Sequence, residues 1–241
     1  MLTPIDCIAL RTIKYNDRHN ILVVYTRQRG RMSLLIGSGT SREANRRRAI
    51  TMPLSLLECI VDLRNDRDIP SIREIKVKRQ LAGLHADPAK MAMGMFLAEI
   101  LGIVLAEGAE DDNLYSFIED GITRLSDMRR GTANFHLAFL YRLGYFLGIQ
   151  PDTSSYRDGR VFDLVDAIFR DVPPIHGRYL EASEARSVAM LSRMTWDNLH
   201  LFRFNREQRR QILTSILDYY SLHYASLSSL NSLDVLRRLF D

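Results

Sequence analysis

The first third of the chain alternates apolar and polar residues in the way short β-strands do. Within residues 5–15 the apolar side chains change parity, which predicts a bulge or bend. Residues 21–26 and 31–37 are further β-branched or aromatic runs, and residues 72–78 alternate apolar with basic side chains. Residues 54–63 suit either a strand or a helical turn followed by a strand. Short strands separated by turns predict a small closed or partly closed barrel, with a generic antiparallel sheet as the alternative.

From residue 87 the pattern becomes helical. Asp87 and Pro88 suit the N-cap and the first position of a helix that runs to about residue 106 and is apolar on most sides. Residues 162–169 fit a short helix or an extended piece. Further helices are predicted over residues 111–128, 132–147, 181–193, 205–226 and 232–240. The predicted class is α+β: a small β-barrel, or the alternative antiparallel sheet, over residues 1–81, then an all-α domain over residues 82–241.

The composition predicts a cytoplasmic protein and argues against disulfides, a zinc site and a membrane span. The 241 residues, 46% of them hydrophobic, can bury a core without disulfides. Cys7 and Cys59 stand in apolar runs and are predicted to be core thiols, and no Cys-x-x-Cys motif suggests zinc. The apolar run 91–106 contains Glu99 and is shorter than the roughly 20 residues that span a membrane. With no signal-peptide pattern at the N-terminus, a cytoplasmic protein is expected.

Charge is unevenly distributed along the chain. The formal net charge is +4, but residues 1–81 hold 16 lysines and arginines against 8 aspartates and glutamates. The remaining residues are mildly acidic, with 17 basic and 21 acidic side chains. A polyanionic partner is therefore expected at the first domain.

Basic clusters in the first domain are the candidate site. Three groups are present: Arg27, Arg29 and Arg31 at one turn, Arg42, Arg46, Arg47 and Arg48 after the third strand, and Lys76, Lys78 and Arg79 at the domain's end. Any one cluster fits a solvated face, but three in one small barrel favour contact with the phosphates of DNA. The middle group is expected on a mobile loop that becomes ordered with DNA. Tyr15 and Tyr25 are candidate stacking platforms, with at least one of them expected in the core.

No catalytic constellation was found. Phosphate-binding loop, nucleophile-elbow and His-Glu-x-x-His patterns are all missing, and the six histidines are scattered. Asp66 and Asp68 could pair as nuclease metal ligands, but their position before Pro70 favours a solvated turn. The sequence thus predicts no catalytic residue, no metal and no cofactor.

The helical part contains a candidate site for a protein tail. Residues 141–148 are aromatic-rich, and Arg124, Arg129 and Arg130 stand at the far end of the preceding helix. A basic rim beside apolar residues would suit an acidic tail that ends in an aromatic residue. The alternatives are ordinary core packing and arginines that complement a helix dipole.

Five segments carry a family resemblance: residues 3–17, "TPIDCIALRTIKYND"; 24–30, "VYTRQRG"; 143–151, "LGYFLGIQP"; 162–164, "FDL"; and 174–180, "PIHGRYL". They are similar to segments of the RecO family of recombination mediators, in the form found in Bacteroidetes. The passage from the third strand into an arginine-rich segment is also similar. The resemblance extends over the whole chain through short motifs.

The resemblance implies an N-terminal OB-fold barrel that binds nucleic acid, over residues 1–81, and a helical domain over residues 82–241. It also implies a non-enzymatic protein of DNA repair that acts at the bacterial nucleoid. Such a protein binds single- and double-stranded DNA and anneals complementary strands. With RecR it helps load RecA onto strands covered by single-strand-binding protein, whose acidic C-terminal tail it recognises. Many members have a four-cysteine zinc site in the second domain. This chain has no cysteine after Cys59, so zinc is expected to be absent and residues 151–160 to be held otherwise. The residues alone leave open an RNA-binding OB-fold protein with a helical protein-docking domain.

Overall fold

A computed structural model describes residues 2–63, 69–227 and 230–240. The chain separates into two compact units, Met1–Asp127 and Met128–Asp241. The barrel's last strand ends at Arg79, close to the domain boundary expected after residue 81, but the first unit also contains the next three helices.

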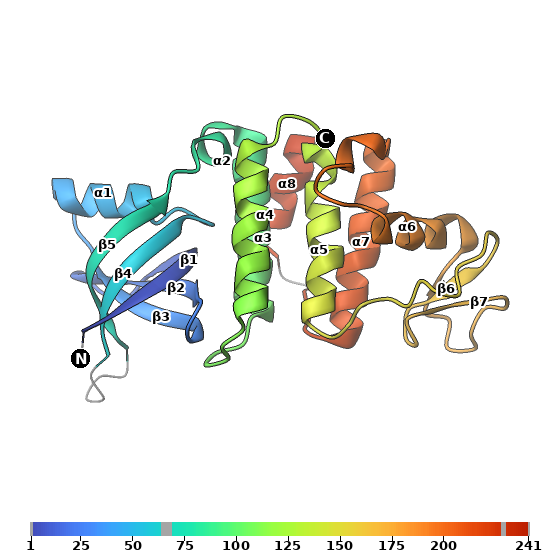
Figure 1. Ribbon diagram of the computed structural model, residues 1–241, viewed down its shortest axis with the longest axis horizontal. Helices are drawn as coiled ribbons and strands as arrows, with labels where there is room; N and C mark the ends of the chain where they lie inside the picture. The colour runs from blue at the N-terminus through green and yellow to red at the C-terminus, as the bar shows by residue number, and fades with distance from the viewer. Residues whose placement is uncertain (1, 64–68, 228–229, 241) are drawn as a thin grey trace. The chain divides into compact units, whose positions relative to one another are not determined.

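The first unit begins with a five-stranded barrel of the OB type (Figure 1). Its strands are β1 (Leu2–Lys14), β2 (His19–Thr26), β3 (Gly30–Gly37), β4 (Leu56–Asp62) and β5 (Ser71–Arg79). They close in the order β1-β2-β3-β5-β4, and the pairing of Leu35 with Ser71 joins β3 to β5. A bulge between Ala9 and Arg11 accounts for the change of parity that the sequence shows in β1.

Apolar side chains from all five strands fill the barrel. Buried residues include Ile5, Leu22, Leu34 and Val61. Cys7 and Cys59 lie among them as free thiols, with their Sγ atoms 3.6 Å apart, as the sequence predicted for core cysteines.

The arginine-rich segment after β3 is a helix, α1 (Arg42–Ile50), so the prediction of a mobile loop was wrong. Ser41 caps the helix, since its Oγ accepts a hydrogen bond from the amide of Ala44 at 3.1 Å. Glu43 in the first turn and arginines in the last turn complement the helix dipole. The helix escaped notice because Ala44 is its single clearly buried side chain, which leaves no hydrophobic periodicity to read.

Three helices complete the first unit: α2 (Ala82–Ala86), α3 (Pro88–Val104) and α4 (Asp112–Asp127). Asp87 caps α3 as predicted, with Oδ1 accepting from the amide of Ala89 at 2.9 Å. Helix α3 is buried along most of its length and packs against β1 and α4. Helix α2 packs against the end of α4, where the amide of Leu84 donates to Ser126 Oγ at 3.2 Å.

The second unit is helical, with one small sheet added. Its helices are η1 (Thr132–Asn134), α5 (Phe135–Phe146), α6 (Ala182–Ser192), η2 (Leu199–Leu201), α7 (Arg206–His223) and α8 (Ser232–Phe240). Its strands are β6 (Val161–Asp163), β7 (Ile168–Arg170) and β8 (Tyr179–Leu180), in the order β7-β6-β8. Of the two interpretations open for residues 162–169, the extended one is correct.

Hydrogen bonds and ion pairs hold residues 151–160. Arg160 pairs with Asp171 at 2.7 Å and donates to the carbonyl of Ser155 at 2.7 Å. The amide of Asp152 donates to the carbonyl of Ala167 at 2.9 Å. Within the described ranges, the helices are all too short or too polar to cross a membrane.

Candidate nucleic-acid interface

Helix α1 presents four arginines against a single acidic side chain. Glu43 Oε1 lies 3.5 Å from Arg46 Nη1 and 3.3 Å from Arg47 Nε, so two cations share one carboxylate. Arg48 donates to the carbonyl of Gly39 at 2.6 Å and to Asn45 Oδ1. Arg42 is exposed and has no ion pair within the part of the chain that the structure describes. The helix therefore has a net positive charge and guanidinium groups open to solvent.

The β1–β2 turn lies beside the start of α1. Ser38 donates from its amide to the carbonyl of Arg18 and from its hydroxyl to the carbonyl of Asp17, both at 2.9 Å. At the same end of the barrel, Arg47 lies over Gly37, where a Cβ atom would be 2.6 Å from Arg47 Nη1. These contacts bring the turn, the β3–α1 connection and the helix together.

We call this end of the barrel the basic ridge, made of Lys14, Arg18, Arg42, Arg46, Arg47 and Arg48. Lys14 and Arg18 are exposed members that sequence reasoning missed. The β-strand pattern could have found them, because it places the β1–β2 turn at the barrel end from which the β3–α1 connection leaves.

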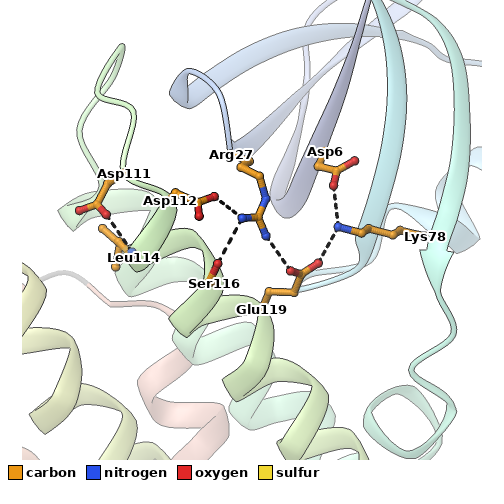
Figure 2. A network of polar contacts seen from close by, with 8 residues as sticks. All are labelled: Asp6, Arg27, Lys78, Asp111, Asp112, Leu114, Ser116 and Glu119. Carbon is orange, nitrogen blue, oxygen red and sulfur yellow. Dashed lines mark hydrogen bonds and ion pairs between the residues drawn. The ribbon is translucent and has the colours of Figure 1, made fainter.

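Arg27 lies at the opposite end of the β2–β3 hairpin and contacts helix α4 (Figure 2). Its guanidinium donates to Glu119 Oε2 at 3.0 Å, to Ser116 Oγ at 3.2 Å and to Asp112. It also lies 4.4 Å from the ring centroid of Tyr115, a cation–π contact. Partial burial disfavours the charge, but the hydrogen bond and charge of Asp112, together with Glu119, raise the pKa of Arg27 above its ordinary value.

Lys78 completes the same network from β5. Its Nζ lies 2.8 Å from Glu119 Oε1 and 2.6 Å from Asp6 Oδ2, as Figure 2 shows. Burial acts against the ammonium group, yet Asp6 and Glu119 together raise the pKa of Lys78. We call Asp6, Arg27, Lys78, Asp112 and Glu119 the α4 network.

Of the remaining predicted cations, three form ion pairs within the first unit and one is exposed without an ion pair to any described residue. Arg31 donates to the carbonyl of Gly102 at 2.7 Å and pairs with Glu107 at 3.1 Å. The other pairs are Lys76 with Glu58 at 2.6 Å and Arg79 with Asp127 at 3.3 Å. Arg29 is exposed and has no ion pair in the described ranges. The structure therefore separates the ten predicted residues into an open group at the basic ridge, a group engaged with α3 and α4, and a few exposed or surface-paired cations.

The two tyrosines have different surroundings. Tyr25 is 2% exposed and stacks on Tyr115 of α4, with ring centroids 6.0 Å apart. Tyr15 is 56% exposed in the β1–β2 turn. The expectation that at least one of the two belongs to the core is confirmed.

The three arginines proposed for tail recognition lie in different units. Arg124 is in α4 and pairs with Asp120 at 2.8 Å, whereas Arg129 and Arg130 are exposed at the start of the second unit. The second unit also contains a groove of about 400 Å³ between α6 and α7. Met190, Phe204 and Ile212 supply its apolar part, and Arg186 and Arg203 are among its charged residues.

The candidate nuclease pair cannot be placed, because Asp66 and Asp68 lie outside the described residues. Within the described ranges, no three histidine, cysteine, aspartate or glutamate side chains are grouped closely enough to hold a metal ion.

Comparison with known proteins relates this architecture to a family. The model named "Recombination protein O N terminal" matches residues 1–81, and "Recombination protein O C terminal" matches residues 85–234. The chain belongs to the recombination protein O family. Curated relatives named "DNA repair protein RecO" come from Phocaeicola vulgatus (40% identical), Bacteroides fragilis (38%) and Porphyromonas gingivalis (35%), each aligned over 100% of both chains.

Membership in the recombination protein O family makes this chain a DNA-repair recombination protein. The resemblance seen in the sequence motifs is thereby confirmed, as is the fold class of an OB barrel followed by a helical region. In this RecO-family chain, the end of the first family model at residue 81 falls directly after β5, and the second model begins within α2.

Proposed function

We propose that this protein is a DNA-binding recombination mediator without enzymatic activity. It binds single- and double-stranded DNA and anneals complementary strands. With RecR it helps load RecA onto DNA covered by single-strand-binding protein. Family membership supports the repair role, and the basic ridge is the observation that supports direct contact with DNA.

The proposed mechanism is electrostatic. Phosphates of two complementary strands repel one another, and arginines that neutralise them lower the barrier to pairing. Guanidinium groups suit this role because they stay charged and form bidentate contacts with phosphate. Helix α1 is well suited because it holds four such groups at fixed helical spacing near one carboxylate, that of Glu43.

The predicted DNA-binding residues are not equal candidates under this proposal. Arg42, Arg46, Arg47 and Arg48 are the primary ones, and Arg29, Lys76 and Arg79 are secondary because they are exposed or paired at the surface. Arg27, Arg31 and Lys78 already satisfy their charges within the first unit. We propose that these three hold the barrel to its helices, and that phosphate contact falls to the others.

Recognition of the acidic tail of single-strand-binding protein is proposed for the arginines at 124, 129 and 130. The α6–α7 groove is a rival location, because it combines apolar side chains with Arg186 and Arg203. Binding of a labelled tail peptide separates the two. If the double variant Arg129→Ala and Arg130→Ala loses peptide binding, the first location is supported. If the double variant Arg186→Ala and Arg203→Ala loses peptide binding, the groove is supported.

The deciding experiment compares two triple variants in DNA binding and strand annealing at low salt. Arg46→Ala, Arg47→Ala and Arg48→Ala together should weaken both activities at least tenfold. The charge-matched control changes Arg157, Arg178 and Arg210, three exposed arginines of the second unit, to alanine. Unchanged affinity in the α1 variant would remove α1 from the interface.

Two further arms test the other function classes. If RNA of the same sequence displaces labelled DNA more strongly than DNA does, the RNA-binding alternative is favoured. If DNA is cut during incubation with Mg²⁺, the non-enzymatic proposal fails. An annealing assay on strands covered by single-strand-binding protein, with and without that protein's tail, tests partner recognition.

A further inference from the structure

The outer surface of the barrel has a row of apolar side chains across three strands. In the strand register Ile13 pairs with Ile21, and Ile21 pairs with Leu35. Their chain neighbours Leu22 and Leu34 point into the barrel core. Because side chains alternate along a strand and paired residues share a face, Ile13, Ile21 and Leu35 point outward.

This row is open to solvent, whereas the other end of the same face is covered. Ile13 is 40% exposed, and Ile21 and Leu35 are partly exposed. Tyr25, two pairs further along the face from Ile21, is buried against Tyr115 of α4. Helix α4 therefore covers one end of the outer face, whereas the apolar residues towards the β1–β2 turn stay partly exposed.

An aromatic ring extends the open surface. Tyr15 follows Ile13 by two residues and is 56% exposed in the β1–β2 turn. Local hydrogen bonds order this turn: Asn16 Oδ1 accepts from the amides of Arg18 at 3.0 Å and His19 at 2.8 Å. The ring therefore projects from a well-defined loop.

Basic side chains border the apolar row, so the surface suits a partner that carries negative charge. Arg11 is exposed on the same face, and Lys14 and Arg18 are exposed in and beside the turn. These three side chains form no ion pair in the described ranges, and Asp17 is the acid of the turn. An apolar strip with an aromatic end and a basic border matches a strand that offers both bases and phosphates.

We propose that this surface, formed by Ile13, Tyr15, Ile21 and Leu35, contacts the bases of single-stranded DNA. The inference rests on the proposed DNA-binding function and adds base contact to phosphate contact. Tyr15 stacks on a base, the isoleucine–leucine row packs against the neighbouring bases, and the phosphates face Arg11 and the basic ridge. A duplex hides the faces of its bases, so this surface makes the protein favour single strands.

The test uses two oligonucleotides with the same number of phosphates: an oligothymidylate and a strand in which most positions are abasic. Wild-type protein should bind the oligothymidylate several-fold more tightly. Tyr15→Ala should weaken that complex about tenfold, as expected for loss of one stacked base. The same variant should bind the abasic strand and a duplex as wild type does. Tyr15→Phe keeps the ring and should retain at least half of the affinity.

Tyr145→Ala is the matched control, because Tyr145 is also exposed, at 65%, and lies in the second unit. Equal binding of both strands by wild-type protein would overturn the base-contact proposal while leaving phosphate binding intact. Failure to bind any of the strands would instead overturn the proposed function. Photo-crosslinking with 5-iodouracil at a central position gives a second measurement, and a crosslink at Tyr15 supports the proposal. Crosslinks confined to the second unit would contradict it.

Discussion

Glu119 Oε2 accepts a hydrogen bond from Arg27 Nη2 at 3.0 Å, which joins the β2–β3 turn to helix α4. The other carboxylate oxygen of Glu119 binds Lys78 from β5. One acidic residue thus fixes the β2–β3 turn and strand β5 to the helix. Some cations of this basic domain therefore stabilise its fold, because acidic side chains of the same unit neutralise them.

Replacing Glu119 with glutamine should destabilise the first unit. Arg27 and Lys78 would each lose a charged partner at sites where their side chains are 28% and 27% exposed. We expect a loss of about 1–2 kcal/mol in the free energy of unfolding, measured in urea. The control is Asp120→Asn, whose partner Arg124 is on the helix surface, with an expected loss below about 0.5 kcal/mol.

DNA binding by an Arg27 variant distinguishes cations that stabilise the fold from cations that bind DNA. Arg27→Ala should lower the unfolding free energy and leave DNA affinity within about twofold of wild type. If Arg27→Ala weakens DNA binding as much as Arg47→Ala, the guanidinium reaches the nucleic acid despite its pairing.

The salt dependence of DNA binding should report on helix α1. Each phosphate contact on single-stranded DNA contributes about 0.7 to the slope of log affinity against log salt. Replacing Arg46, Arg47 and Arg48 with alanine should therefore reduce the slope by up to about 2. The triple variant at positions 157, 178 and 210 should keep the wild-type slope, and an unchanged slope in the α1 variant would exclude these arginines as phosphate ligands.

The cap of α1 should affect both stability and binding. Ser41→Ala removes the acceptor for the amide of Ala44 and should cost about 1 kcal/mol of helix stability. Hydrogen exchange of the α1 amides should accelerate, and DNA affinity should fall because the arginines lose their fixed spacing. Ser41→Asn retains a capping oxygen and should restore slow exchange. If exchange in the alanine variant matches wild type, the cap does not stabilise α1.

Two glycines of the first unit should respond oppositely to alanine. At Gly83 in α2, a Cβ atom would lie 2.1 Å from the carbonyl oxygen of Ser126, so the packing of α2 on α4 must shift. Gly83→Ala should cost at least about 2 kcal/mol. At Gly102 in α3, a Cβ atom would meet no atom within 4 Å, so Gly102→Ala should stabilise by about 0.5–1 kcal/mol. Thermal unfolding measures both, and similar destabilisation at both positions would contradict the packing described.

The second unit should lose stability in acid through His136. Burial, with a smaller contribution from Arg209, lowers the pKa of His136 to about 3. The unfolded chain binds a proton below about pH 6.5, whereas the folded unit does not, so the stability present above that pH is lost as pH falls towards 3. The expected slope is roughly 1 kcal/mol per pH unit.

Urea unfolding at pH 7 and pH 5 checks this prediction. His136→Gln should remove most of the difference between the two pH values. The exposed His200 changed to glutamine provides the control and should leave the difference intact. A wild-type protein equally stable at both pH values would show that His136 takes up its proton without disturbing the fold.

Strands of the barrel and most helices could be predicted from the sequence, because burying one face imposes a period on side chains. The alternating runs gave β1, β2 and β3, and Asp87 with Pro88 gave the start of α3. Helix α1 could not be found in this way, because its side chains are mostly solvated and its stability comes from Ser41 and helix-forming residues. Strand β8 was missed, and the segment of β6 and β7 was left open between a helix and an extended piece, because each of these strands has only two or three residues, too few for a period to be visible.

By itself, the sequence determined that the first domain is basic, that a barrel precedes helices and that no known catalytic motif is present. Only the tertiary structure decided which cations remain open. Arg27 and Arg47 are both arginines in basic clusters, but Arg27 meets three α4 side chains about 85–92 positions away in the chain, whereas Arg47 shares Glu43 within its own helix. Charge is a property of composition, whereas neutralisation depends on distance in space, and folding sets that distance.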